Sequence, residues 1–180
     1  MRDFLHEPVT ESITIHAPIE RVFALSTRVE LVKDTLGMEL VDSALPNAIT
    51  SGHIAAHSRV HWRGWKFGLP TSHHTLITGF APPERQPTGE VTASFQDSQE
   101  RGRFAFFQHD HFFRQAYDPH NPSTVLSELH DEIRFALPFG PLGRLAATLL
   151  LAPHIRRLAR RRFAMLKALA EGDGWRAWAD

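Results

Sequence analysis

Two histidines close together in the sequence are the first residues that could do chemistry as a pair. The segment His109-Asp110-His111 places two imidazoles on one face of an expected strand, because strand side chains alternate between faces. Such a pair supplies two metal ligands, but no third ligand follows at a recognised spacing and no H-E-x-x-H motif is present. We therefore expect ordinary hydrogen bonds from these histidines, and no metal or cofactor. A histidine could also act as a general base, because its ordinary pKa lies near 6.5, but the sequence does not select which one.

Asp131 is a carboxylate on an apolar face. In the expected strand Thr124–Leu137 the odd positions carry Leu129, Ile133 and Phe135, and Asp131 belongs to the same side. Arg162 is its counterpart, because at about 100° per residue it falls inside the apolar stripe of the expected C-terminal helix. Two interpretations stay open: a buried Asp131–Arg162 ion pair that is structural, or two polar groups that line a cavity and orient the polar head of a ligand.

Aromatic residues on three expected strands are the candidate apolar lining of such a cavity. Any single one of them is more often part of the core than of a binding site. The candidates are Trp62 and Trp65 on one strand, Phe95 on a second, and Phe104 and Phe107 on a third. With His109, His111, Asp131 and Arg162 they make up the predicted ligand-binding residues.

The elements that position these residues follow a simple order. Alternation predicts a strand over Glu11–Ala17, and Pro18 and Gly37 bound two short helices, the second over Val29–Leu36. A run of strands follows from Met38 to Leu137, and tight turn signals between them indicate an antiparallel meander. A helix from Gly140 to about Glu171, kinked or split at Pro153, ends the chain. The predicted strands are Glu39–Ser43, Ala55–Lys66, Thr71–Phe80, Glu90–Asp97, Arg103–Ala116 and Thr124–Leu137.

Composition bounds the class of protein. With 180 residues the chain fits one domain, 1–180 with a core of about 11–171. The absence of cysteine excludes disulfide scaffolds, thiolate metal sites and thiol catalysis. Twenty basic residues balance twenty acidic ones, which argues against binding of nucleic acid. No signal peptide or apolar stretch of about 20 residues is present, so we expect a cytoplasmic protein.

The balance of charge is uneven along the chain. Residues 141–171 hold seven basic side chains and one acidic one, so the C-terminal helix is basic and the remainder acidic. One-sided contact with an anionic membrane or a partner is therefore an alternative function. The residues that would make this contact are Arg156, Arg157, Arg160, Arg161 and Lys167.

Several motifs resemble the SRPBCC superfamily, which includes START, Bet v 1, polyketide cyclase and coenzyme Q-binding relatives. Ile15–Ala24 is similar to the entry strand and helix of that superfamily. Phe95-Gln-Asp97, Gly102-Arg-Phe104 and His109-Asp-His111-Phe112 resemble the F-x-D…G-P-F…H-x-H-x-F run of a bacterial cyclase/dehydrase-like subgroup. Asp131–Gly143 and Arg162 are similar to its junction and final helix, whereas Arg103 and Phe107 depart from its commoner proline and tryptophan.

The resemblance implies an α+β helix-grip fold, in which a curved antiparallel β-sheet wraps around a long C-terminal helix. It also implies a hydrophobic-ligand cavity beneath that helix, without implying a reaction, because one fold hosts carriers, sensors and enzymes. The leading hypothesis is binding of a lipid, quinone or polyketide-like small molecule without catalysis. The alternatives are a cyclase or dehydratase acting on such a ligand, and the docking module described above.

Overall fold

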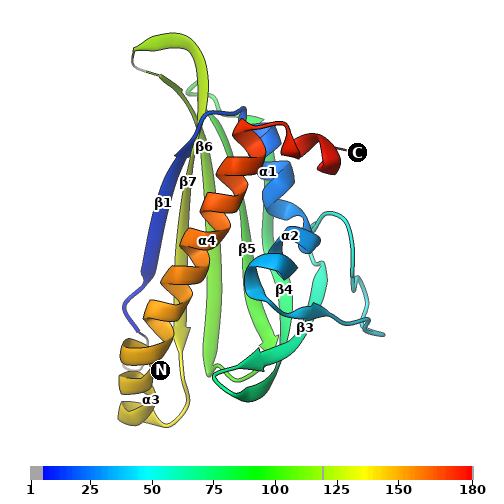
Figure 1. Ribbon diagram of the computed structural model, residues 1–180, viewed down its shortest axis with the longest axis vertical. Helices are drawn as coiled ribbons and strands as arrows, with labels where there is room; N and C mark the ends of the chain where they lie inside the picture. The colour runs from blue at the N-terminus through cyan, green and yellow to red at the C-terminus, as the bar shows by residue number, and fades with distance from the viewer. Residues whose placement is uncertain (1–5, 119, 180) are drawn as a thin grey trace.

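One curved antiparallel sheet forms the back of the molecule (Figure 1). The computed structural model describes residues 6–118 and 120–179, and within them the sheet order is β1-β7-β6-β5-β4-β3-β2. The strands are β1 (Val9–Ile15), β2 (Glu39–Leu40), β3 (Arg59–Lys66), β4 (Leu69–Arg85), β5 (Val91–Arg101), β6 (Phe106–Asp118) and β7 (Asn121–Ala136). The strands β3 to β7 pair with their neighbours in sequence, which confirms the predicted meander, and β1 closes the order beside β7.

Helices cover one face of the sheet. The short helices α1 (Ile19–Thr27) and α2 (Val29–Leu36) follow β1, and Gly37 ends α2 in the left-handed conformation that the sequence predicted. The C-terminal segment contains α3 (Gly140–Ala146), a π-helical turn η2 (Ala147–Leu151), α4 (Ala152–Glu171) and a short 3-10 helix η3 (Gly174–Trp178). Figure 1 shows α4 running diagonally across the inner face of the sheet.

Pro153 divides the C-terminal helix as predicted. It stands at the second residue of α4, where its missing N–H costs little, and the π-helical turn lies directly before it. The helical prediction over Gly140 to about Glu171 is therefore confirmed, and beside Pro153 the backbone changes from π-helical to α-helical geometry without leaving the helical region.

Several strand limits were wrong. The strand β2 has two residues rather than five, and β3 begins at Arg59 rather than Ala55. The strand β4 continues through Pro82 and Pro83 to Arg85, beyond the predicted end at Phe80. Irregular pairing with β5 between Ala81 and Glu84 explains this extension, because a bulge frees strand positions from the ladder that a proline cannot join.

The interior consists of two apolar clusters. The larger lies under α1, α2 and the second half of α4, and it contains Phe95, Phe113 and Phe163. The smaller joins Ile133 and Phe135 of β7 to the first half of α4. Burial of these apolar side chains between the helices and the sheet is the main stabilising contribution to the fold. In the described residues no helix is long and apolar enough to cross a membrane. The predicted domain, 1–180, includes residues 1–5, 119 and 180, which lie outside the described residues.

Candidate functional site

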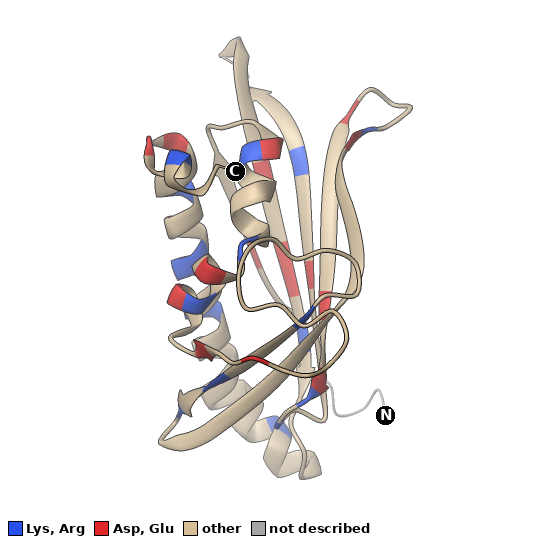
Figure 2. Cartoon of the chain, turned by 90° about the vertical axis from the view of Figure 1, so that its right-hand side faces the viewer, with Lys and Arg blue, Asp and Glu red and all other residues tan. Residues whose placement is uncertain are grey.

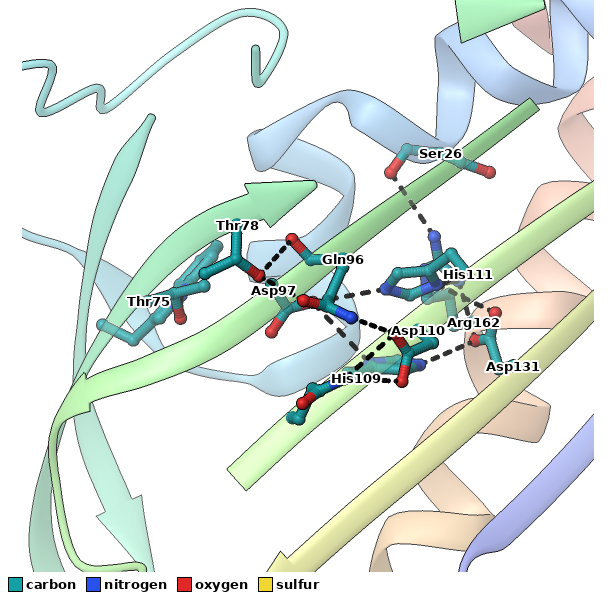
Figure 3. A network of polar contacts seen from close by, with 12 residues as sticks. Ser26, Thr75, Thr78, Gln96, Asp97, His109, Asp110, His111, Asp131 and Arg162 are labelled. Carbon is teal, nitrogen blue, oxygen red and sulfur yellow. Dashed lines mark hydrogen bonds and ion pairs between the residues drawn. The ribbon is translucent and has the colours of Figure 1, made fainter. Parts of the chain in front are cut away.

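Five polar side chains meet on the inner face of the sheet, where the two apolar clusters adjoin (Figure 3). They come from four elements that are distant in sequence. Asp97 lies on β5, His109 and His111 on β6, Asp131 on β7 and Arg162 on α4. We call these five residues the inner cluster.

Asp131 is the centre of the inner cluster and is 1% exposed. Arg162 Nη1 donates to its Oδ2 at 3.0 Å, which is the ion pair of the first of the two interpretations left open by the sequence. Since a carboxylate only accepts, His111 Nδ1 carries a hydrogen and donates to Asp131 Oδ1 at 2.8 Å. His109 Nε2 lies 3.2 Å from Asp131 Oδ2, but without the direction of a hydrogen bond.

Asp97 forms the other edge of the inner cluster. Its Oδ2 lies 3.3 Å from His111 Nε2 and 3.9 Å from His109 Nδ1. The side chains of Asp97 and His109 are 16% and 15% exposed, whereas those of His111 and Asp131 are 4% and 1% exposed. The cluster is therefore closed around Asp131 and open on the side of Asp97 and His109.

The pKa values of the two imidazoles are shifted in opposite directions. Burial and the neighbouring His111 lower the pKa of His109. Burial also opposes charge on His111, but the carboxylates of Asp131 and Asp97 together raise the pKa of His111. A proton shared by the pair therefore resides on His111.

Both carboxylates of the inner cluster stay ionised. Burial favours their neutral forms, but the charges of His111 and Arg162 hold the pKa of Asp131 well below its ordinary value. Burial likewise favours the neutral form of Asp97, but the hydrogen bond from His111 and the charges of the neighbouring imidazoles together lower its pKa. The site presents a buried negative group, held by Arg162, and a second negative group at its accessible edge.

Of the five predicted aromatic residues, Phe95 contacts the inner cluster, and three more are buried or half-buried elsewhere in the interior. Phe95 stacks on His111 with ring centroids 4.0 Å apart, and Trp62 is buried on β3. Phe104 and Phe107 are partly buried beside the smaller apolar cluster, and their ring centroids are 4.9 Å apart. His73 makes an edge contact with Phe107 on the same side.

Trp65 does not join this group. It is 70% exposed, because residues three apart on a strand point to opposite faces and Trp62 takes the inner one. The sequence also left open which face of β6 is internal. The odd positions His109, His111 and Phe113 are internal, whereas Phe112 is 46% exposed on the outer face.

The expected cavity beneath α4 is not among the clearest hollows of the described residues. The larger hollow, about 670 Å³, lies mainly over outward-facing positions of the sheet, among them Ser12, Phe112 and His130. A second lies near the β3–β4 end and includes Ser72 and Arg101. Neither is lined by a residue of the inner cluster.

Basic residues recur along the C-terminal helix (Figure 2), and their contacts divide them into two sets. Arg156 and Arg160 pair with Glu11 on β1, and Lys167 pairs with Glu171. Arg157 and Arg161 lie on the side of Lys66 and His154, whose pKa values burial and these neighbouring cations lower. Three of the five residues predicted for docking therefore make ion pairs within their own chain.

Asp97 and His73 are the site residues that the sequence prediction missed. Both carried a signal. Asp97 shares the odd positions of its strand with Ala93 and Phe95, and His73 shares those of its strand with Thr75 and Ile77. The alternation argument that singled out Asp131 applies equally to these residues.

Solved structures with the same arrangement decide the fold. No protein-family model matches the sequence, and no curated protein is similar to it. The di-domain ARO/CYC BexL from the BE-7585A biosynthetic pathway superposes with a TM-score of 0.56 and 12% identity, over 94% of this chain and 51% of that one. TTHA0849 from Thermus thermophilus has a TM-score of 0.55 and 15% identity, over 97% of this chain and 100% of that one. Ara h 8.0201 has a TM-score of 0.52 and 12% identity, over 92% and 97%.

The chain has the helix-grip fold. Its curved antiparallel sheet and long C-terminal helix are the α+β architecture that the sequence predicted. The chain spans about half the length of BexL, so it corresponds to one of two domains there. At these identities the likeness concerns the fold alone.

Proposed function

We propose that this helix-grip protein, as a single domain of residues 1–180, binds a hydrophobic or amphipathic small molecule between the sheet and α4. The observation that carries the proposal is a polar cluster buried between two apolar clusters and accessible at one edge. A ligand of this class has one polar group and a larger apolar body. A lipid, a quinone or a polyketide-like compound fits this description.

The polar group of the ligand is assigned to the accessible edge of the inner cluster. Asp97 and His109 are the members that a ligand reaches, whereas Asp131, His111 and Arg162 are partnered with one another. The apolar body would lie against Phe104 and Phe107, which are only partly buried. Membership of the bacterial cyclase/dehydrase-like subgroup is part of this proposal and rests on the sequence motifs.

Entry of the ligand requires an opening beside α4. Phe67, on the turn between β3 and β4, contacts His154 at the start of α4 with ring centroids 5.0 Å apart. It is 60% exposed, so little apolar area holds this contact closed. Separation of the β3–β4 turn from α4 is the proposed route to the inner face.

A fluorescence titration with 1-anilinonaphthalene-8-sulfonate tests this proposal. Phe107→Ala removes apolar area from the inner site, and we expect roughly tenfold or greater loss of affinity. Phe112→Ala is the matched control, because it removes the same side chain from the outer face of the same strand. Displacement of the dye by a fatty acid, a short-chain quinone or a polycyclic phenol then distinguishes the ligand classes.

Two results would contradict the proposal. One is the absence of saturable binding by the wild-type protein. The other is loss of binding in Phe112→Ala but not in Phe107→Ala, which would place the dye in the outer hollow that Phe112 lines.

The two alternative functions stay predictions. A cyclase or dehydratase needs an inward acid or base free of structural partners. Asp131, His111 and Arg162 are occupied by one another, whereas His109 Nε2 has no hydrogen-bond partner among the described residues and makes His109 the candidate base. A docking module needs free cations on α4, and Arg156, Arg160 and Lys167 are paired with carboxylates of this chain. Cytoplasmic localisation also stays a prediction.

A further inference from the structure

We propose that Asp97, His109 and His111 bind a divalent transition-metal ion, with Asp131 orienting both imidazoles. The sequence showed only two of these ligands, and the fold supplies the third from β5. The site stands independently of the small-molecule proposal, because it is defined by the protein side chains alone.

The spacing of the three donor atoms fits a common centre. One donor atom from each of Asp97, His109 and His111 lies within 4.8 Å of the other two. The separations from Asp97 Oδ2 are 3.3 Å to His111 and 3.9 Å to His109. Tetrahedral bonds of about 2.0 Å place ligand atoms about 3.3 Å apart, so small side-chain rotations bring the three into register.

The second nitrogen of each imidazole faces Asp131. His111 uses Nδ1 at 2.8 Å and His109 uses Nε2 at 3.2 Å, so the two rings turn opposite nitrogens toward the same carboxylate (Figure 3). A metal-bound histidine characteristically donates its other N–H to a carboxylate, which fixes the tautomer and aims the free lone pair at the metal. The His111 ring already donates to Asp131 from Nδ1, and a metal at its Nε2 would replace the hydrogen that this nitrogen shares with Asp97. The His109 ring faces Asp131 without the direction of a hydrogen bond, so it needs a small rotation to donate.

The fixed charges leave room for a cation. Asp97 and Asp131 contribute two negative charges, and Arg162 is the one guanidinium that contacts this pair among the described residues. Arg162 bonds to Asp131 Oδ2 and is held from its other amine by the Ser26 carbonyl. Asp97 therefore has no permanent cation beside it within the described part of the chain, and a divalent ion would supply one.

The donor set indicates the class of metal. Two imidazoles and one carboxylate suit zinc, iron, cobalt or nickel, whereas calcium and magnesium prefer oxygen ligands throughout. Three protein ligands leave one position for water or for an oxygen of a bound molecule. That position lies on the accessible side formed by Asp97 and His109. Only the suggestion that the small molecule coordinates there rests on the proposed function.

Metal titration of chelator-treated protein tests the site without any apolar ligand. We expect one equivalent of Zn²⁺ by calorimetry, and one equivalent of Co²⁺ with the absorption bands of a site of low coordination number. Asp97→Ala and His109→Gln remove ligands and should abolish the Co²⁺ bands. Asp131→Asn should weaken Zn²⁺ binding by roughly 10–100-fold, the usual effect of removing an outer partner of the ligands.

The controls address the twelve histidines of the chain. His61 and His74 stack on the outer face with ring centroids 3.9 Å apart, so His61→Ala and His74→Ala remove a second strand-paired set of imidazoles. Both variants should keep the Co²⁺ bands and a Zn²⁺ affinity within about twofold of wild type. Circular dichroism checks the fold of every variant, and Asp97→Ala decides the test if His109→Gln does not fold.

Two outcomes would overturn the metal site. One is the absence of stoichiometric Zn²⁺ or Co²⁺ binding by the wild-type protein. The other is binding that survives in Asp97→Ala and disappears in His61→Ala or His74→Ala, which would assign the metal to the outer face. Neither outcome affects the dye titration, which is carried out without metal.

Discussion

Two buried carboxylates on opposite faces of the same sheet have different surroundings. Asp131 points inward from β7 and Asp110 points outward from β6, and they are 1% and 6% exposed. Each contacts an arginine, Arg162 for Asp131 and Arg134 for Asp110. Both groups are labelled in Figure 3.

The difference lies in what the other partners do. Asp110 accepts hydrogen bonds from the side-chain amides of Gln96 and Gln108. Among the described residues, these amides bring no further titratable group into contact with Asp110. Asp131 contacts two imidazoles, and each ring has a second nitrogen directed toward Asp97. A carboxylate surrounded by amides and arginine is a structural pair, whereas one surrounded by imidazoles continues into a set of donor atoms that a ligand or metal can use.

Among the substitutions that test this difference, the largest expected effect is on the free energy of unfolding. Asp131→Asn leaves Arg162 buried without its counter-charge, and we expect a loss of about 3–5 kcal/mol in the free energy of unfolding. Asp110→Asn should cost less, about 1–2 kcal/mol, because Arg134 is 39% exposed and water replaces part of the interaction. Urea denaturation of the two variants measures the difference. Equal losses of unfolding free energy would show that the inner ion pair contributes no more to stability than the outer one.

A double substitution separates the structural role of Asp131 from its binding role. Asp131→Asn with Arg162→Met removes both charges, and we expect it to be about 1–3 kcal/mol more stable than Asp131→Asn alone. If the pair also serves binding, dye and Zn²⁺ affinity stay reduced in the double variant. Full recovery of both affinities would make the pair purely structural.

Two neighbouring residues on β5 should show opposite effects: Gln96→Ala should affect stability and not Co²⁺ binding, and Asp97→Ala should mainly affect Co²⁺ binding. Gln96→Ala removes an amide donor from Asp110 on the outer face, and we expect a loss of about 1 kcal/mol with unchanged Co²⁺ binding. Asp97→Ala should abolish Co²⁺ binding and change stability by less than Gln96→Ala, because Asp97 lies at the accessible edge of the inner cluster. Thermal unfolding measures the stability of both variants, and the Co²⁺ absorption bands measure their metal binding.

The smallest effect is expected at an exposed ion pair. Glu11→Gln removes the carboxylate that Arg156 and Arg160 contact at the edge of the sheet. Solvent and salt screen such pairs, so the urea midpoint should move less than in any variant above, and less still in high salt. A shift as large as that of Asp110→Asn would mean that α4 is held to β1 by charge rather than by its apolar face.

The sequence predicted the order of the elements because local patterns encode it. Alternation and turn residues indicated the meander, Gly37 and Pro153 marked helix limits, and the apolar stripe of α4 placed Arg162 on its inner side. Strand ends were predicted less well, since the extension of β4 through Pro82 and Pro83 depends on how β5 pairs beside it.

The candidate site was predicted in part. Alternation within one strand identified Asp131, and the helical period identified Arg162, because each is a local property of one element. Trp65 was wrongly predicted to bind the ligand. Strand alternation already places it on the opposite face from Trp62, because the two residues are three positions apart. Phe107 and His109 could not be assigned to the inner face until the register of β6 was known.

The sequence by itself determined the residue types, the class of each element and the side of β7 and α4 on which Asp131 and Arg162 lie. Only the tertiary structure decided that Asp97 of β5 stands beside His109 of β6, because strand register depends on pairing between segments rather than within one. It also decided which imidazole nitrogens face Asp131 and which face Asp97. Those orientations come from packing of side chains from four elements, and no local pattern specifies them.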